Sequence, residues 1–449
     1  MHQIFLKAKS HLMLRLMLFL GISILIINNL TSAATENSIF KPYTKATLEN
    51  GLTLIVKENH SAPIAAIDIR VAVGSVNESP DQAGISHFVE HMLFKGTKRR
   101  KVGEIAGEIK AVGGVLDGMT SLDTTHYYVV VPSEYLELAL DVEADAIQNS
   151  VFAPEEIDRE RNVVFEDIRI HQDRPSGTLG ELMLIERLYA GTPYAHNLVG
   201  TPETLNNINR DALLAHYHKY YIPNNMTIAV VGDVDTDKVM SRIKELFKDF
   251  KPQKLVPPPT VELSTITKII RFELQKDIRQ SYFYIGFPTP PLNSKDIATL
   301  GVLKILLGGC KSARLNSLYS EELIRSISVE YLEFRDMGVF RIYAETQNAE
   351  LLEKRIQAIL RKVVEEGVTD KELAMAKAVL QTGYALDTER VLNLAFMMSS
   401  LESYGSIEDG VEYERCLQEV TKEDIQRVAG KYINLNAYKA LIIKPMEVK

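Results

Sequence analysis

Two features that many proteins depend on are scarce in this sequence of 449 residues. It contains only two cysteines, Cys310 and Cys416, which excludes a disulfide-dense scaffold and a zinc site made of cysteines. It also lacks a long run of lysine and arginine, and its formal net charge is -8, so its field repels a phosphate backbone. We therefore expect no nucleic-acid partner. The pairing of the two cysteines is open, because two small buried thiols are an equal alternative to one disulfide.

Long apolar runs are also rare, and the one that stands out lies at the N-terminus. Three basic residues precede it, namely Lys7, Lys9 and Arg15. The run covers residues 16–27, which is shorter than the about 20 residues of a spanning helix, and small residues follow at 31–34. This pattern predicts that residues 1–34 are a signal peptide, with an uncleaved N-terminal anchor as the alternative. We expect a periplasmic or secreted protein, anchored to the inner membrane in the second case.

The rest of the composition is that of a soluble globular protein, with 46% apolar and 24% charged residues. A chain of this length exceeds what one hydrophobic core usually supports, so we expect two domains. Clustered prolines from Pro252 to Pro259 can continue neither helix nor sheet, and they predict a linker at residues 251–260. The expected domains are therefore residues 40–250 and residues 261–449.

The apolar patterns predict an α+β fold with two related domains, each a mostly antiparallel sheet covered by helices. In the first half we expect strands at 52–56, 64–73, 125–131 and 229–232, and helices at 84–94, 102–112, 134–148 and 154–172. In the second half we expect strands at 280–287 and 338–346, and helices at 295–308, after 351 and after 370. The similar order of elements suggests an internal duplication.

One short motif carries chemistry. In His87-Phe88-Val89-Glu90-His91 the two imidazoles are four residues apart, so on a helix they share one face and can both bind one metal ion. Glu90 lies on the same edge, where it can accept a proton from a metal-bound water. Two histidines and a carboxylate with an open position suit Zn²⁺ best. The alternative is a chance match on a solvated helix.

Acidic residues of the helix expected at 154–172 provide candidates for a third ligand. Glu160 and Asp167 are two turns apart on one side and flank the apolar stripe, whereas Glu166 points away. A carboxylate on the buried side needs a partner, which a metal or a metal-ligating histidine would supply. We count Glu160 among the catalytic residues, and its alternative is a salt bridge to Arg159, Arg161 or another cation.

At this point the sequence resembles the pitrilysin and insulinase family, most closely its half-length branch with mitochondrial processing peptidase and bacterial zinc peptidases. The resemblance covers nearly the whole mature chain. It rests on segments 50–52, 84–97 and 160–164, and on Tyr221, Pro223, Asn224, Asn225 and Met226 ahead of Gly232. It implies a bilobed clam-shell of two α+β halves that closes over an unfolded peptide, with one zinc ion in the first half. The inverted motif implies a zinc metalloendopeptidase.

The sequence departs from the family pattern at three places. The register of the third ligand, a Glu in the family, falls on Asp167, with Glu166 as the alternative. The Asn-Ala of the edge strand that receives substrate is Asp117-Gly118 here. Of the Arg and Tyr that hold the substrate carbonyl, Arg314 is kept, but the Tyr register falls on Ile327. Two nearby tyrosines could substitute for it, Tyr319 and Tyr331.

These departures leave several functions open. In half-length relatives a partner subunit can supply the missing Arg and Tyr, so we expect a homodimer, or a heterodimer with a related half-length chain. The first hypothesis is a zinc endopeptidase that binds peptides as an added strand. The second is a catalytically impaired subunit that holds peptide or metal for an active partner. The third is an assembly subunit that keeps only the fold. We expect His126 and His196 to be packing or turn residues.

Overall fold

The computed structural model describes residues 38–173, 178–255, 257, 261 and 265–446. The expected signal peptide at 1–34 and part of the expected linker, residue 256 and residues 258–260, lie outside this range. Within the described part of the chain, none of the helices combines the length and the apolar character needed to cross a membrane.

The first half builds a six-stranded sheet in the order β1-β2-β6-β3-β5-β4. Its neighbouring strands run antiparallel, except for the parallel pair of β2 and β6. The strands are β1 Thr44–Thr47, β2 Thr53–Glu58, β3 Ile64–Val71, β4 Val115–Thr120, β5 Thr125–Pro132 and β6 Met226–Gly232. The helices of this half are α2 Ile85–Leu93, α3 Glu104–Ala111, α4 Leu136–Asn149, α5 Pro154–Asp173, α6 Thr178–Leu188, α7 Pro202–Asn207, α8 Arg210–Tyr220 and α9 Thr236–Phe247.

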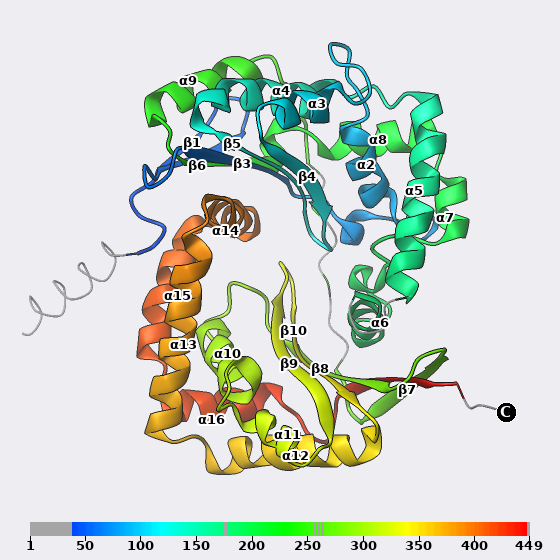
Figure 1. Ribbon diagram of the computed structural model, residues 1–449, viewed down its shortest axis with the longest axis vertical. Helices are drawn as coiled ribbons and strands as arrows, with labels where there is room; N and C mark the ends of the chain where they lie inside the picture. Colours follow the sequence, from blue (N-terminus) through cyan, green and yellow to red (C-terminus); the bar gives the residue numbers. More distant parts are fainter. Residues whose placement is uncertain (1–37, 174–177, 256, 258–260, 262–264, 447–449) are drawn as a thin grey trace, which may run out of the picture.

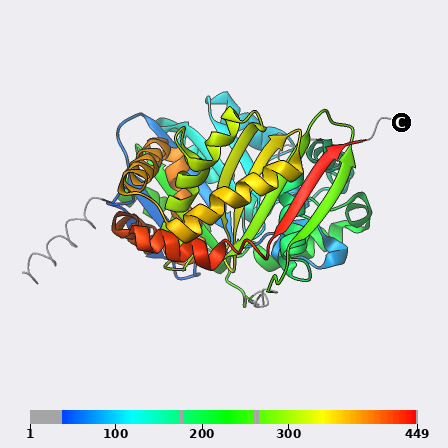
Figure 2. The ribbon, with the colours of Figure 1, turned by 90° about the horizontal axis from the view of Figure 1, so that it is seen from below.

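The second half builds a five-stranded sheet in the order β7-β11-β8-β10-β9. Its strands are β7 Ile270–Lys276, β8 Ser281–Thr289, β9 Ile324–Glu333, β10 Gly338–Thr346 and β11 Lys439–Pro445. Its helices are α10 Ile297–Lys304, α11 Ser317–Ser320, α12 Ala349–Glu366, α13 Asp370–Thr388, α14 Val391–Tyr404, α15 Ile407–Glu419 and α16 Lys422–Tyr432. Figure 2 shows α12 lying across the outer face of this sheet, with β7 and β11 at one side.

The two sheets repeat one topology. Leaving out β1, the order β2-β6-β3-β5-β4 corresponds strand for strand to β7-β11-β8-β10-β9. The first pair is parallel in both sheets, and the remaining pairs are antiparallel. This confirms the expected α+β architecture of two related, mostly antiparallel units. The shared topology agrees with an internal duplication.

Each sheet is covered on its inner face by a helix of the opposite half (Figure 1). Helix α14 of the second half packs on β3 and β6, and helix α6 of the first half packs on β8 and β11. The first contact buries Val391, Leu394 and Met398 against Ala66 and Val231 of the first sheet. The second buries leucines of α6 against the second sheet. The exchange holds the two halves in a closed arrangement.

A buried polar network also joins the halves under α14. Asp68 of β3 is fully buried, and one of its oxygens lies 2.7 Å from Nδ1 of His126 on β5. Its other oxygen accepts a hydrogen bond from Ser399 of α14. Arg70 lies 3.5 Å from Asp68 and donates to the hydroxyls of Ser399 and Thr124. As expected, His126 is a packing residue in this network.

Most expected elements are present, and the differences have local causes. The helix expected at 295–308 starts at Ile297 and continues from Ile305 to Gly309 as a wider π-helical turn. A Cβ at Gly308 would lie 2.4 Å from Val329 of β9, so only glycine lets this turn approach the strand. The helix expected at 102–112 starts at Glu104, after Gly103 in a left-handed conformation.

The core of the first half contains one carboxyl group without a hydrogen bond. Glu143 of α4 is fully buried, and neither of its oxygens has a partner among the described residues. Burial raises its pKa to about 8, and the charge of Asp68 adds to the shift. Folded Glu143 therefore keeps its proton at neutral pH while the unfolded chain releases it.

This predicts a stability that depends on pH in a defined direction. Because the pKa of Glu143 is higher in the folded state, its contribution lowers the free energy of unfolding as pH rises from about 4.5 to about 8. We expect Glu143→Leu to raise the free energy of unfolding by about 2 kcal/mol at pH 8. Thermal melts should show a larger gain at pH 8 than at pH 5. The exposed Glu137→Leu is the control, and an equal gain at both pH values would contradict the prediction.

Candidate metal centre

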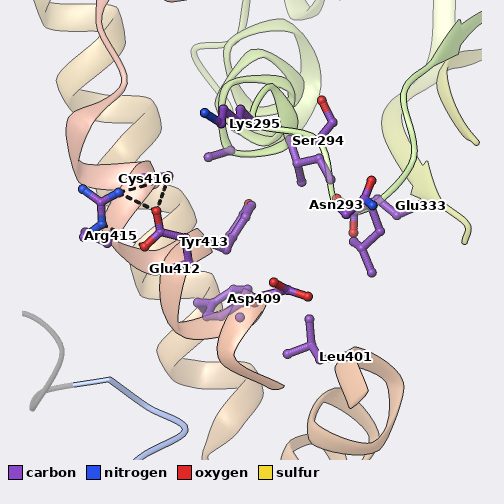
Figure 3. A pocket seen from close by; sticks show the side chains of 15 residues that line it. Asn293, Ser294, Lys295, Glu333, Leu401, Asp409, Glu412, Tyr413, Arg415 and Cys416 are labelled. Carbon is purple, nitrogen blue, oxygen red and sulfur yellow. Dashed lines mark hydrogen bonds and ion pairs between the residues drawn. The ribbon is translucent and has the colours of Figure 1, made fainter. Parts of the chain in front are cut away.

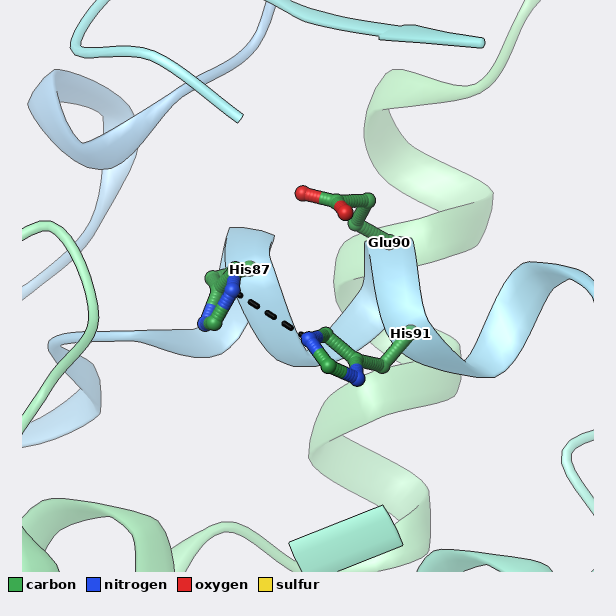
Figure 4. A group of neighbouring side chains, drawn as sticks. All are labelled: His87, Glu90 and His91. Atoms are coloured by element: carbon green, nitrogen blue, oxygen red, sulfur yellow. Dashed lines mark hydrogen bonds between the residues drawn. The ribbon is translucent and has the colours of Figure 1, made fainter. Parts of the chain in front are cut away.

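The candidate site is built on helix α2, which has one face in the core and one face that carries the motif. Ile85, Phe88, Val89 and Met92 are buried in the core of the first half. The opposite face carries the three residues of the motif, His87, Glu90 and His91. Figure 4 shows both imidazoles on one side of the helix, with the Glu90 carboxylate projecting separately. The apolar spacing thus fixes the helix and leaves the polar face for chemistry.

The start of this helix is held by Glu78. Its carboxylate accepts hydrogen bonds of 2.8 Å from the backbone N–H groups of Gly84 and Ser86. Burial raises the pKa of Glu78 to about 8, although the two N–H bonds lower it. Gly84 has φ +92°, and a Cβ there would lie 2.8 Å from the backbone of Gly200, so glycine is required. The Ser86 hydroxyl also contacts Nε2 of His216 at 3.1 Å.

We expect Glu78→Ala to loosen the first turn of α2 and to weaken metal binding. It would leave two buried N–H groups without an acceptor, at a cost of about 1–3 kcal/mol each. The zinc dissociation constant, measured by competition with a chelator, should rise by about tenfold or more. Glu78→Gln keeps one acceptor oxygen and should have a smaller effect. A dissociation constant unchanged in both variants would show that Glu78 does not position the motif.

The two histidines approach each other at the distance that a zinc site needs. Nε2 of His87 and Nε2 of His91 are 3.3 Å apart. With Zn–N bonds of about 2.0–2.1 Å and tetrahedral angles, two nitrogen ligands lie about 3.4 Å apart. Together with Glu90, they are the group of described residues whose donor atoms lie within 4.8 Å of one another. The donor set present therefore fits zinc.

Asp167 lies on the same side of the site, on helix α5. Its Oδ2 is 3.3 Å from Nε2 of His91, the atom that also faces His87. It stands outside the compact group of His87, Glu90 and His91, so it has to move closer to complete a tetrahedron. Glu166 is exposed and pairs with Arg169. The position of Asp167 thus agrees with the helical-face argument, and its role as the third ligand stays a prediction.

Glu90 lies between the histidines and strand β4. The Thr120 hydroxyl donates a 2.6 Å hydrogen bond to its Oε2. Burial raises the pKa of Glu90, the charge of Asp117 adds to the increase, and the Thr120 bond and His91 oppose it. A Cβ at Gly118 would lie 3.0 Å from Cγ of Glu90, so a glycine on β4 leaves room for this side chain. A carboxyl group with a raised pKa suits proton transfer near neutral pH.

Glu160 is in contact with a motif histidine, as expected for a carboxylate beside a metal ligand. Its Oε2 lies 3.3 Å from Nδ1 of His91, and Lys95 donates to its other oxygen at 2.7 Å. Burial raises the pKa of Glu160, but the bonds from His91 and Lys95 lower it more, and the net shift is downward. The pKa of His91 is lowered by burial but raised more by Glu160, Glu90 and Asp167, so its net shift is upward. This contact leaves Nε2 of His91 to face His87.

The two sheets differ at the edges that correspond to each other. Strand β4 ends the first sheet, and Val115 and Met119 on it are 57% and 51% exposed. Strand β9 ends the second sheet and contacts α10, α11 and the turn at Ile305–Gly309, as β4 contacts α2 and α3. The Tyr319 hydroxyl also accepts a hydrogen bond from the backbone N–H of Ile327 on β9. This N–H is therefore already paired, whereas the β4 edge lies beside Glu90.

The second-half residues that were expected to hold the substrate carbonyl form other contacts in this structure. Arg314 forms a bidentate pair with Glu372 and donates to the Gly367 carbonyl. This pair lowers the pKa of Glu372 to about 2. Binding of substrate by Arg314 would require the pair to open, and its catalytic role stays a prediction. The Tyr319 hydroxyl accepts a hydrogen bond from the backbone of Ile327, and the Tyr331 hydroxyl is buried near Thr289.

The two cysteines do not form a disulfide, and His196 makes a local contact. Cys310 contacts Met375 and Cys416 contacts Glu412, and both thiols are free. His196 contacts the Ser75 carbonyl, as expected for a packing residue.

Three residues that contribute to the candidate site were not expected from the sequence, namely Glu78, Lys95 and Thr120. Lys95 is four residues past His91, in the turn that follows the end of α2 at Leu93, and this spacing is the signal that the sequence contains.

Comparison with known proteins identifies the family. The family model "Insulinase (Peptidase family M16)" matches residues 53–202, and "Peptidase M16 inactive domain" matches residues 207–380. A protein named "Uncharacterized zinc protease" from Rickettsia felis is 31% identical over 389 residues, which cover 85% of this chain and 90% of that protein. The chain belongs to peptidase family M16. The first match contains the whole candidate site from His87 to Asp167.

Other members of family M16 agree with this membership. The "Uncharacterized zinc protease YmxG" of Bacillus subtilis is 32% identical over 348 residues, covering 76% of this chain and 84% of that protein. The crystal structure of a protease from Helicobacter pylori superimposes with a TM-score of 0.85 at 26% identity, covering 90% of this chain and 99% of that one. The fold is thus that of M16-like two-domain peptidases, and the relatives are zinc proteases by name.

Proposed function

We propose that the chain is a zinc-dependent endopeptidase that hydrolyses peptides or unfolded segments. The observation that carries this proposal is the 3.3 Å approach of the His87 and His91 Nε2 atoms, next to a half-buried Glu90. His87, His91 and Asp167 would hold one zinc ion, and Glu160 would orient His91 through Nδ1. When bound, zinc lowers the pKa of a water molecule and polarises a peptide carbonyl.

The residues of the chain perform the proton transfers in this proposal. Glu90 accepts the proton of the attacking water and passes it to the leaving amine. Thr120 holds its carboxylate in place, and burial raises the pKa of Glu90, which makes it a stronger base than an exposed carboxylate. Substrate adds as a strand along β4, through backbone hydrogen bonds at Asp117 and Gly118.

We further propose that the working enzyme contains a second half-length chain. Arg314 is paired with Glu372, and Ile327 stands at the position where relatives carry Tyr. A hydrogen-bond donor for the substrate oxyanion is therefore missing from this chain. One lost donor costs about a hundredfold in rate. A related subunit, or a second copy of this chain, would supply it. The alternative function, an impaired subunit that holds peptide or metal, is favoured by the same engagement of Arg314.

The proposed organisation follows the sequence pattern. Residues 1–34 would act as a signal peptide or anchor and direct the protein to the periplasm or outside the cell. Residues 40–250 would carry the metal, residues 251–260 would link the halves, and residues 261–449 would help to bind substrate.

Bound zinc per chain, measured by elemental analysis, tests the site. We expect about one zinc in the wild type and in Glu166→Ala, and a loss of zinc in Asp167→Ala, because Asp167 lies 3.3 Å from Nε2 of His91 whereas Glu166 pairs with Arg169. Loss in Glu166→Ala alone would assign the third ligand to Glu166. A wild type without zinc would exclude the peptidase. Zinc binding without hydrolysis of a quenched fluorescent peptide, with or without a related chain, would favour the impaired subunit.

A further inference from the structure

A cavity of about 490 Å³ lies in the second half, between the loop before α10 and helices α13, α14 and α15 (Figure 3). None of the residues that line it belongs to the zinc motif or to β4. Its carboxylates include Asp409, which is exposed, and Glu412, which pairs with Arg415. Contacts that select a peptide are therefore expected on β4, the strand whose Thr120 holds Glu90.

The backbone of β4 has hydrogen-bonding groups on its outer side. It is the last strand of the first sheet and pairs with β5. The Ser121 N–H donates to the Thr124 carbonyl at 2.8 Å, and hydrogen-bonded pairs alternate with other pairs along an antiparallel ladder. Gly118 faces Tyr127 three positions earlier, so it belongs to a pair that is not hydrogen-bonded. Its N–H and C=O therefore point to the outer edge, where an added strand would pair.

The N–H of Gly118 is taken by a side chain of its own strand. It donates a 2.9 Å hydrogen bond to Oδ1 of Asp117. Asp117 is exposed and forms no ion pair within the part of the chain that the structure describes. Burial is the main cause of the raised pKa of Glu90, and the charge of Asp117 adds to it, so Asp117 acts on the proposed cleavage site. A peptide that adds to β4 has to compete with this carboxylate for the N–H.

Asp117 stands between two apolar side chains on one face of β4. Side chains alternate along a strand, so Val115, Asp117 and Met119 share a face, and all three are exposed. The opposite face meets helix α2, since a Cβ at Gly118 would lie 3.0 Å from Cγ of Glu90. The exposed face thus presents an apolar, an acidic and an apolar side chain in this order along the strand.

We propose that Asp117 selects peptides that carry a lysine or arginine opposite it, with an apolar residue two positions away on each side. This inference rests on the proposed function, because it takes β4 as the strand to which substrate adds. On binding, the Asp117 carboxylate leaves the Gly118 N–H to a carbonyl of the peptide and pairs with the basic side chain. Val115 and Met119 contact the two apolar residues. Opposite charges that face each other across two strands stabilise their pairing, and like charges oppose it.

Three fluorescently labelled peptides that differ at one position test this selection. Each contains Val-Ser-X-Ser-Val between uncharged ends, with Lys, Gln or Glu at X. Fluorescence anisotropy gives their dissociation constants on the Glu90→Gln protein, in which hydrolysis is slow. We expect the Lys peptide to bind about fivefold tighter than the Gln peptide at low salt, and the Glu peptide about fivefold weaker.

A charge reversal at Asp117 separates this contact from the net negative charge of the protein. In the same Glu90→Gln protein, Asp117→Lys should invert the order, so that the Glu peptide binds most tightly. Asp117→Asn should remove most of the difference between the Lys and Glu peptides. The matched control is Asp249→Lys, which changes the net charge equally at an exposed residue after α9, a helix that packs on β2. Because β2 is four strands away from β4, this control should keep the original order.

The outcomes for the selection and for the peptidase are distinct. Equal affinity for the Lys and Glu peptides would overturn the inference, as would a preference for Lys that persists in Asp117→Lys. Hydrolysis of the three peptides by the wild type at equal kcat/KM would also overturn it and would leave the peptidase in place. Binding in the expected order without hydrolysis by the wild type would support the selection and contradict the peptidase. Absence of binding of all three peptides at millimolar concentration would overturn the inference.

Discussion

Glu90→Gln should reduce peptide hydrolysis by about a thousandfold while the protein keeps its zinc. The amide cannot accept the proton of the attacking water, and general acid–base catalysis typically contributes factors of about 10²–10⁴. Gln has the shape of Glu and can still accept the hydrogen bond from Thr120, so the surroundings of the side chain should stay in place. The rate is measured as kcat on a quenched fluorescent peptide, with zinc content determined on the same sample.

The control for this experiment is Glu245→Gln, which removes an exposed carboxylate of α9 that pairs with Arg242. It should leave both kcat and zinc content unchanged. If Glu90→Gln retains wild-type kcat, the general base lies elsewhere. If it loses zinc along with activity, Glu90 acts as a ligand, which its place within 4.8 Å of both histidines would allow.

Asp68→Ala should lower the free energy of unfolding by about 3–5 kcal/mol, the cost of breaking a buried ion pair from one side. Arg70 is 6% exposed and would lose its carboxylate, keeping only the hydroxyls of Thr124 and Ser399. The loss would also remove one of the polar contacts between α14 and the sheet that it covers, because Ser399 donates to Asp68. Urea unfolding followed by circular dichroism measures the effect.

Ser399→Ala provides a graded comparison at the same place. It removes one hydroxyl from the network and leaves the charges of Asp68 and Arg70 in contact, so the expected loss is about 1.5–3 kcal/mol. Equal effects of the two variants would mean that the hydroxyl, and not the ion pair, joins the halves. A change below about 1 kcal/mol in Asp68→Ala would contradict the role of the network.

Helices and strands with a clear apolar pattern could be predicted from the sequence. Strands whose conformation depends on pairing with a neighbouring strand could not. Strand β3 consists mainly of apolar residues and strand β5 mainly of β-branched and aromatic residues, and both were expected close to their observed bounds. Strand β4 was not expected as a strand from its pattern, since Asp117 and Gly118 are poor strand formers, and pairing with β5 imposes its conformation. In β7, Ile270, Phe272 and Leu274 alternate with polar residues, so this strand, which was not expected, has a strand pattern in its sequence.

The candidate site divides in the same way. The spacing of His87 and His91 on an apolar helix predicts one shared face, and the 3.3 Å contact of their Nε2 atoms agrees with this. The contact of Glu160 with His91 joins α5 to α2, and the helical-face argument placed this side chain correctly on the buried side. Glu78 carried no such signal, because its function depends on a loop that folds back onto the first turn of α2.

The exchange of helices between the halves has a consequence for the order in which the chain can fold during synthesis. The first sheet is complete once β6 has been made, at Gly232, but the helix that covers its inner face ends at Tyr404. Until the ribosome has released that segment, Ala66, Ala229 and Val231 have no apolar partner from α14. Nascent chains therefore carry this uncovered apolar sheet face while the residues between Gly232 and Tyr404 are made, a surface of the kind that chaperones bind.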